Sequence, residues 1–256
     1  MHAPFACRVQ SLWILTPLAN GASVCTGRSS SRVCVASKSR LGGSRSRSPP
    51  PIPVAGAATR RVPQAHPQIE FRVDASDRIA DLEAEGLDLA IRRSRPSRVD
   101  TSDHVRLLCE EFVTPALSAQ LLERSGAPLH SPLDLQRLPL IEIDDSLRAS
   151  FAASWRRWFE TFGVSVQPSG AKMTFSFIDQ AAQAAVRGQG VVLGHTPMLD
   201  DALAAGQLSA PFPDLKMPTG YSYYLVLNPQ RSTAPEVVVF VRWLLEEFAR
   251  GPRRQT

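Results

Sequence analysis

The stretch Ile69–Arg92, IEFRVDASDRIADLEAEGLDLAIR, has the pattern of a complete strand–helix–strand unit. Over 69–75, apolar residues alternate with polar ones, which is typical of a strand with one buried face. The short polar side chains that follow are common helix caps, and an apolar stripe over 77–85 predicts an amphipathic helix. Gly86 stands where such a helix would end, and the short apolar run at 88–92 suits a buried parallel strand.

The same alternation continues to the end of the chain. It predicts an α/β fold in which helices cover parallel sheets. The further strand-like runs are 105–114, 138–143, 191–195 and 221–227, and the further helical stretches are 115–124, 150–162, 178–188, 199–205 and 235–249.

Several motifs of the chain occur in the order found in one bacterial family. The segment EGLDLAIR at Glu85–Arg92 is followed by six more, namely Phe112–Leu117 (FVTPAL), Trp155–Phe159 (WRRWF), Ala181–Leu193 (AAQAAVRGQGVVL), Leu203–Phe212 (LAAGQLSAPF), Tyr223–Val226 (YYLV) and Phe240–Glu246 (FVRWLLE). No single motif is specific, but their order is. Over about three quarters of its length, from Pro63 to Arg250, the chain resembles the effector-binding domain of LysR-type transcription regulators, in the branch that includes the glycine-cleavage activators.

This resemblance implies two Rossmann-like α/β subdomains of the type 2 periplasmic-binding-protein architecture. Subdomain I would take about 64–111 and 220–250, subdomain II about 112–219, and 251–256 would form a C-terminal tail. Family members have one more strand and helix before the position of Pro67. Because no such pattern is visible here, we expect subdomain I to lack a central strand and to expose a sheet edge.

Residues 1–63 differ from the rest in composition, with many Arg, Ser, Gly and Pro residues and little to bury, so we expect a disordered tail. Residues 1–69 hold nine basic residues and no acidic one, whereas 70–256 hold 20 basic and 24 acidic residues. The net charge of +5 therefore comes from the tail. No winged helix-turn-helix pattern, with which the family normally begins, is visible in it.

Three explanations of this tail stay open. An arginine-rich arm would neutralise nucleic-acid phosphates, and the apolar stretch Ser11–Ala19 after Arg8 is compatible with a secretory signal. We favour a third, a frameshift or misplaced start that removed the DNA-binding domain. Arginine outnumbers lysine 26 to 3, which indicates GC-rich coding DNA, and normal reading would resume near 61–66.

The composition argues against several other classes of protein. Cys109 is the only cysteine outside the tail, which fits a reducing cytoplasm, and no zinc-ligand spacing occurs. No apolar run approaches the roughly 20 residues of a membrane span. Nucleophile-elbow, phosphate-loop and dinucleotide motifs are lacking as well. We therefore expect neither an enzyme, nor a metal site, nor a cofactor, nor a membrane protein.

Ligands of open α/β sheets bind beyond the carboxyl ends of the strands, where helices begin. Together with the family resemblance, this rule predicts effector contacts in four places, where plain capping or packing is the alternative. The predicted contacts are Ser76, Asp77, Thr114, Thr174, Ser176, Phe177 and His195. In the family, a helix of subdomain I packs against a subdomain II helix of another protomer, which implies a dimer interface at Ile79, Leu82, Ala181, Ala184 and Ala185.

The sequence thus predicts a cytoplasmic ligand-sensing domain of a LysR-type regulator that binds a small effector, such as an amino or organic acid, between its subdomains. Family resemblance implies a homodimer or tetramer, and we expect DNA binding only if a helix-turn-helix is restored. An exported solute-binding protein of the same fold is the leading alternative. An interaction module without a ligand is a third possibility.

Overall fold

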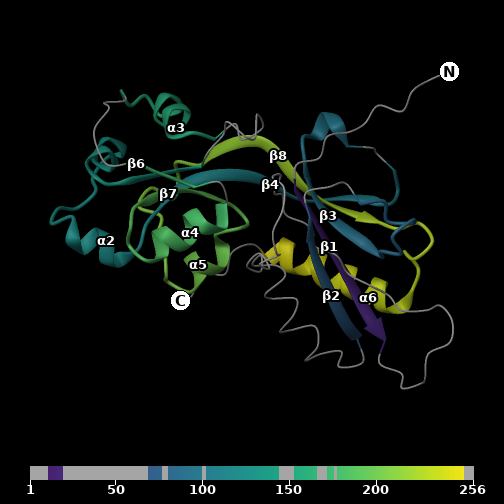
Figure 1. The fold of residues 1–256 in the computed structure, drawn as a ribbon. Coiled ribbons are helices and arrows are strands. Elements are labelled where there is room, and N and C mark those ends of the chain that lie inside the picture. The colour runs from purple at the N-terminus through teal and green to yellow at the C-terminus, as the bar shows by residue number, and fades with distance from the viewer. Residues whose placement is uncertain are drawn as a thin grey trace, which may run out of the picture. The chain divides into compact units, whose positions relative to one another are not determined.

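The computed structural model describes residues 11–19, 69–76, 80–99, 102–143, 153–165, 172–175 and 178–250 (Figure 1). The chain divides into two compact units. Unit 1 comprises Met1–Glu110 and Tyr221–Gly251, and unit 2 comprises Glu111–Gly220 and Pro252–Thr256. The chain passes from one unit to the other within two long strands, β4 (Val105–Ala116) and β8 (Met217–Leu227).

The strands of unit 1 follow one another in the order β2 (Ile69–Ser76), β1 (Ser11–Ala19), β3 (Leu89–Ser94) and β8. β1 is antiparallel to both β2 and β3, so the two strands predicted from the opening stretch are parallel to each other. β3 is antiparallel to β8, with Leu89 opposite Leu227. The α/β class is confirmed, but the sheet is mixed rather than purely parallel.

β1 lies in the part of the chain that we expected to be a disordered tail. Residues 12–19 of β1 pair with the whole of β2, and residues 11–13 pair with part of β3. Trp13, for example, lies opposite Ala75 on one side and opposite Ile91 on the other. The apolar run thus fills the central position that we expected to be empty. The physical reason is that unpaired edges of β2 and β3 would leave backbone N–H and C=O groups without partners.

The predicted helix 77–85 is only partly within the described residues, and its described part is a single turn. The backbone N–H of Glu85 donates to the carbonyl of Asp81 at 3.0 Å, and that of Leu87 to Leu82 at 2.8 Å. Oδ1 of Asp81 accepts the N–H groups of Glu83 and Ala84, both at 3.0 Å. Asp81 therefore caps this turn, and the expectation that the cap lies at 75–77 does not apply to it.

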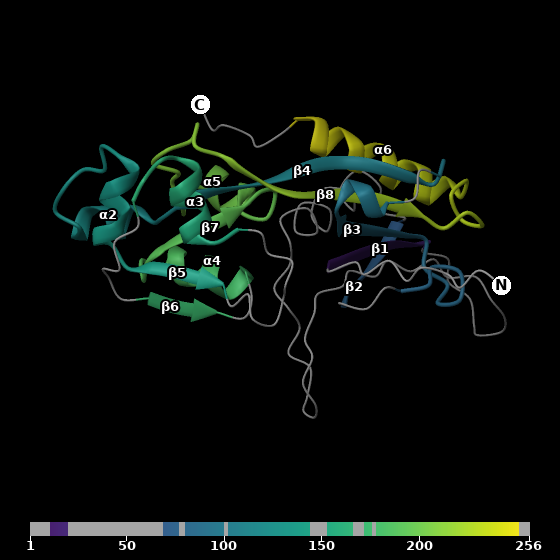
Figure 2. The same ribbon diagram turned by 90° about the horizontal axis from the view of Figure 1, so that it is seen from above.

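Helix α6 (Pro235–Arg250) lies on one side of the unit 1 strands (Figure 2) and contacts β1. Its residues Val237, Phe240 and Leu244 recur at helical spacing and are fully buried. A separate small cluster of Ala80, Leu82, Leu87 and Ala90 packs the turn after β2 onto β3. Unit 1 therefore buries apolar residues from the predicted strand–helix–strand unit and from the C-terminal helix.

The strands of unit 2 follow one another as β4, β7 (Val191–His195), β5 (Leu140–Ile143) and β6 (Lys172–Phe175). β5 is parallel to β6 and β7, as predicted, but β4 is antiparallel to β7. β6 was not predicted as a strand.

The remaining elements are η1 (Pro96–Arg98) in unit 1, and α2 (Ala119–Arg124), η2 (Pro132–Arg137), α3 (Trp155–Thr161), α4 (Ile178–Val186) and α5 (Asp200–Ala204) in unit 2.

Alternate residues of β7 separate the core of unit 2 into two clusters. Val191 and Leu193 join a cluster with Trp155, Trp158 and Phe159 of α3. Val192 joins a second cluster built from the alanines of α4 and from Leu199, beside α5. Since neighbouring residues of a strand point to opposite faces, helices cover both faces of this sheet.

The helix predicted over 115–124 begins later than expected. β4 continues through Pro115 and Ala116, and α2 starts at Ala119, where the Ser118 side chain accepts the backbone N–H of Leu121 at 3.3 Å. Ala116 is buried and lies opposite Val192, so this segment is a core strand. Thr114-Pro115 is therefore not a helix start, because pairing with β7 outweighs the tendency of proline to begin a helix.

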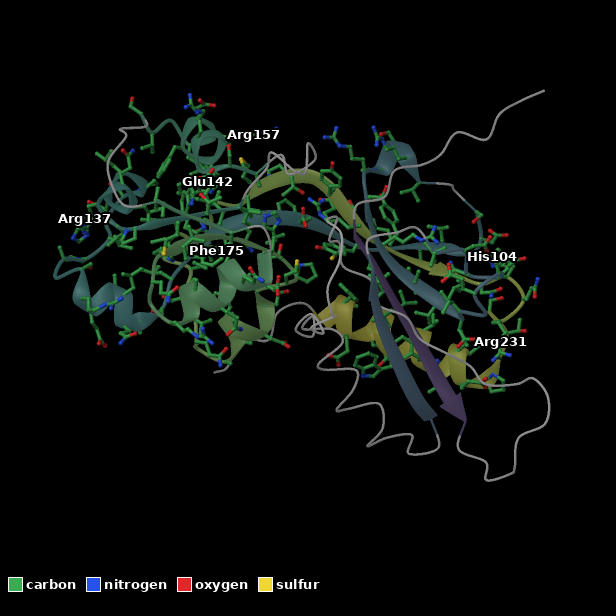
Figure 3. All side chains as sticks on the ribbon, in the orientation of Figure 1. His104, Arg137, Glu142, Arg157, Phe175 and Arg231 are labelled. Atoms are coloured by element: carbon green, nitrogen blue, oxygen red, sulfur yellow. The ribbon has the colours of Figure 1, made fainter. Side chains whose placement is uncertain are left out.

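A buried carboxylate connects β3 to the loop before α6. Oδ1 of Asp88 lies 2.9 Å from Nε of Arg231 (labelled in Figure 3), which also lies 3.5 Å from Glu236. The Asn228 side chain donates to the carbonyls of Leu82 and Leu87. Burial raises the pKa of Asp88 from 3.8 to about 6, and the opposing effect of Arg231 is smaller.

We expect this shift to make stability depend on pH. A carboxyl whose pKa is raised in the folded state contributes stability that is fully present below pH 3.8 and lost as the pH rises towards about 6. At about 1.4 kcal/mol per pKa unit, the contribution is on the order of 3 kcal/mol. Asp88→Asn has no carboxyl at this position, so this pH-dependent contribution should vanish in the variant. The difference in unfolding free energy between wild type and Asp88→Asn should therefore change between pH 4 and pH 6. Asp103→Asn, at an exposed position, should keep the wild-type profile in urea titrations, and identical profiles for all three proteins would contradict this expectation.

Candidate functional site

The carboxyl ends of three parallel strands lie at one edge of the unit 2 sheet. These ends are Ile143 of β5, Phe175 of β6 and His195 of β7. In open α/β sheets, ligands bind beyond such ends. Of the predicted contacts, Thr174 lies on β6, where its side chain is exposed, and the neighbouring Phe175 is half-buried (Figure 3).

His195 is buried at this edge and faces a carboxylate. Its Nδ1 lies 3.4 Å from Oε1 of Glu111, and both side chains are almost inaccessible to solvent. The hydroxyl of Thr219 donates to Oε2 of Glu111 at 2.6 Å. We call Glu111, His195 and Thr219 the buried cluster. It joins β4, β7 and β8 within unit 2, and it fits the alternative in which His195 serves packing and hydrogen bonding.

Thr114 is not brought to the same face as His195. In the register of β4 and β7, Val113 lies opposite His195 and Thr114 opposite Gly194. Paired residues share a face and neighbours alternate, so the Thr114 and His195 side chains point to opposite sides of the sheet. The Thr114 hydroxyl is buried and donates to the carbonyl of Phe212 at 3.3 Å.

For the four remaining predicted contacts, the structure gives no side-chain environment. Ser76 is the last residue of β2, whereas Asp77, Ser176 and Phe177 lie outside the described residues. Effector contact by all of them stays a prediction.

The residues expected at a dimer interface pack within their own unit. Leu82 is buried in unit 1, and Ala181, Ala184 and Ala185 are buried against the unit 2 sheet. Ile79 lies outside the described residues. The predicted interface is not tested by this packing.

Sequence reasoning missed Glu111 and Thr219. Two adjacent acidic residues such as Glu110-Glu111 are usually both solvated, which holds for the exposed Glu110 but not for the buried Glu111. The signal was present in the strand period, since Glu111 shares its face with Val113, which is fully buried.

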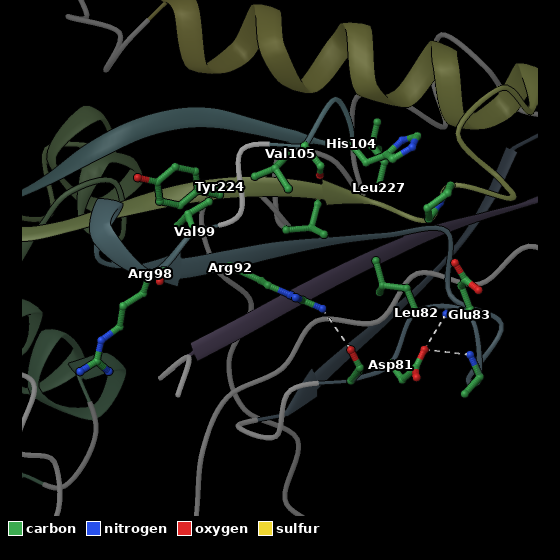
Figure 4. Close-up of a pocket in the computed structure, with 16 residues that line it drawn as sticks. Asp81, Leu82, Glu83, Arg92, Arg98, Val99, His104, Val105, Tyr224 and Leu227 are labelled. Carbon is green, nitrogen blue, oxygen red and sulfur yellow. Dashed lines mark hydrogen bonds between the residues drawn. The ribbon is translucent and has the colours of Figure 1, made fainter. Parts of the chain in front are cut away.

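Unit 1 contains a cavity of about 980 Å³ (Figure 4). It lies over the face of β3 and β8 that carries Arg92, Ser94, Tyr224 and Val226. The turn 80–84 completes its walls together with Arg98, Val99, Ser102, His104 and Val105. Arg92 reaches across it, and its Nη2 donates to the carbonyl of Ala80 at 3.0 Å.

Among the described residues there is no group of three or more His, Cys, Asp or Glu side chains that would hold a metal ion. No helix in the described part of the chain is long and apolar enough to cross a membrane.

Two α/β units, each with parallel strands whose carboxyl ends share an edge, define a small-molecule-binding domain of the periplasmic-binding-protein-like class. The chain belongs to the family of the LysR substrate binding domain, which it matches over residues 55–249. It is 33% identical over 190 residues to the HTH-type transcriptional regulator PerR of Escherichia coli K12, covering 74% of this chain and 60% of that protein. It is 30% identical over 185 residues to the glycine cleavage system transcriptional activator of the same organism, covering 72% of this chain and 57% of the relative.

Solved structures show the same fold. The effector domain of the transcriptional regulator AmpR of Pseudomonas aeruginosa superimposes with a TM-score of 0.54 at 27% identity, over 77% of this chain and 89% of that domain. The AmpR effector-binding domain of Citrobacter freundii gives a TM-score of 0.54 at 23% identity, over 76% and 91% of the two chains.

The domain is therefore the effector-binding domain of LysR-type transcription regulators, as its sequence motifs predicted. The matched proteins are regulators rather than enzymes, and nothing in these matches supports the exported solute-binding protein. The chain spans less than two thirds of the length of these curated relatives.

Proposed function

We propose that this domain binds a small amino or organic acid between its two subdomains and passes the binding event on as a change in their relative orientation. The observation that carries the proposal is the family match over residues 55–249. The carboxyl edge of β5, β6 and β7 supports it, because exposed Thr174 and half-buried Phe175 offer a hydroxyl and an aromatic wall there.

The partners follow from the relatives. Proteins named as HTH-type regulators act on DNA, so we propose that the domain works in the bacterial cytoplasm, as a homodimer or tetramer, with a DNA-binding domain as its output. Such coupling requires that the ligand bind one orientation of the subdomains more tightly than another.

Thermal unfolding of the full chain with the twenty amino acids and a set of small mono- and dicarboxylic acids tests the proposal. A ligand at about 100 times its dissociation constant adds about 2.7 kcal/mol to the unfolding free energy, which shifts Tm by several degrees. We expect at least one compound to do so, and Thr174→Ala to weaken that shift. Thr233→Ala, an exposed position in unit 1, is the matched control. A cooperative transition that no compound moves would overturn the proposal.

A further inference from the structure

The first half of β4 forms an edge of the sheet in unit 1. β8 is its neighbour on one side, and β7, its neighbour on the other side, pairs only with residues 113–116. Hydrogen bonding to the segment after β7 begins at Phe112, whose carbonyl accepts the N–H of Thr196 at 3.0 Å. Among the described strands, none pairs with residues 105–110 on the side away from β8. An edge of this kind presents backbone N–H and C=O groups that can pair with another chain.

The side chains of this edge, Arg106–Glu110 (RLLCE), are only partly covered. Leu107 is 56% exposed, and no other large apolar side chain in the described part of the chain is more exposed. Arg106 and Glu110 are exposed as well, whereas Leu108 and Cys109 are half-buried. A partner that covers Leu107 with apolar surface would remove it from unfavourable contact with water.

A second copy of the same strand fits this edge by charge. When two copies pair antiparallel about a twofold axis at Leu108, Arg106 of each copy lies opposite Glu110 of the other. Leu107 then lies opposite Cys109, so apolar side chains meet between the two charged pairs. Opposite charges directly across a strand pair stabilise it, and like charges destabilise it.

The charges also select this register over the neighbouring ones. A shift by two residues, the smallest that keeps every side chain on its own face, places either Arg106 or Glu110 opposite Leu108. Both shifts lose the two ion pairs. Because both copies use the same edge, the pairing ends at two chains and does not continue into a fibre.

We propose that residues 106–110 of β4 are an interface at which two copies of this chain join their unit 1 sheets. Five residues from each chain bury less area than a standard interface, so the contact is weak and depends on chain concentration. This surface is separate from the dimer interface that family resemblance implies. It also does not require the effector site of the proposed function.

Sedimentation velocity of the full chain over a range of concentrations tests this interface. We expect the mean mass of the wild type to rise with concentration. Arg106→Glu should weaken the association roughly tenfold or more, because two attractive pairs become repulsive, and Glu110→Arg should weaken it to the same extent. Arg242→Glu makes the same charge change at an exposed position on α6 and should associate like wild type. Circular dichroism at low concentration, where the copies separate, should be the same for all these chains and so exclude a loss of folding.

An equimolar mixture of Arg106→Glu and Glu110→Arg gives the decisive comparison. In a mixed pair both contacts join opposite charges again, since the introduced glutamate faces the introduced arginine and the two native residues face each other. We expect the mixture to regain the association that each variant alone has lost. The interface would be overturned by a wild-type mass that does not rise with concentration, by an Arg106→Glu variant that associates like Arg242→Glu, or by a mixture no more associated than its components. None of these results bears on the thermal shifts that test the proposed function.

Discussion

Glu111→Ala should lower the unfolding free energy by about 1–3 kcal/mol, because it leaves the buried Thr219 hydroxyl without its carboxylate acceptor. The variant removes the carboxylate that faces His195 at 3.4 Å and accepts the Thr219 hydroxyl at 2.6 Å. For a chain of this size, each kcal/mol shifts Tm by about 2–4 °C, so the expected loss is roughly 2–12 °C. Thermal unfolding followed by circular dichroism measures it.

The neighbouring residue supplies a matched control. Glu110 carries the same side chain on the same strand but is exposed, so Glu110→Ala should change the unfolding free energy by no more than about 0.5 kcal/mol. Glu111→Gln keeps the shape and an acceptor for Thr219 while it removes the charge. We expect it to fall between wild type and Glu111→Ala, and equal losses in Glu110→Ala and Glu111→Ala would show that the buried cluster adds nothing.

The buried cluster lies beside the points where the chain passes from one unit to the other. Glu111 and Thr219 lie on β4 and β8, within one residue of the points where the chain passes into unit 1. The next residue of β8, Gly220, has a φ of +76°, a conformation that side chains with a Cβ rarely adopt. The buried cluster thus links β4, β7 and β8 next to Gly220, the position at which β8 departs from regular strand geometry.

Much of the fold followed from local sequence patterns. Alternation identified β2, a short apolar run identified β3, and further strand-like runs identified β4, β5 and β7, because such patterns reflect burial within a few residues. β6 escaped because its four residues, Lys172–Phe175, are too few to show a period. The place of β1 was also beyond local reasoning, since it depends on a gap between β2 and β3, strands separated from it by about fifty residues or more.

The candidate site was harder to predict than the fold. Two of the predicted contacts, Thr174 and His195, lie at the carboxyl edge of the unit 2 sheet, and their contact with an effector stays a prediction. Local sequence patterns gave no access to partners such as Glu111, which is 84 residues from His195 in sequence. The cavity of unit 1 was likewise invisible, because its walls come from three separate parts of the chain.

Trp158→Ala should be the most damaging single change in unit 2, with an expected loss of about 3–5 kcal/mol. The Trp158 ring is fully buried, 6.0 Å from the centroid of Trp155 and 5.4 Å from that of Phe159, in edge-to-face arrangements. Its indole N–H donates to the carbonyl of Leu215 at 3.3 Å. Truncation therefore leaves a cavity and a carbonyl that has lost its donor at the same time.

The adjacent Arg157→Ala is the control for α3, since its side chain is exposed and only its backbone takes part in the Ser154 cap. Trp158→Phe keeps most of the ring contacts but not the N–H donor, so its loss should be smaller than that of Trp158→Ala. Urea unfolding followed by circular dichroism compares the three. If Trp158→Ala were no less stable than Arg157→Ala, the aromatic cluster would not support the sheet, and the carboxyl edge with Thr174 and His195 would have to be held by the alanine-lined face of α4 alone.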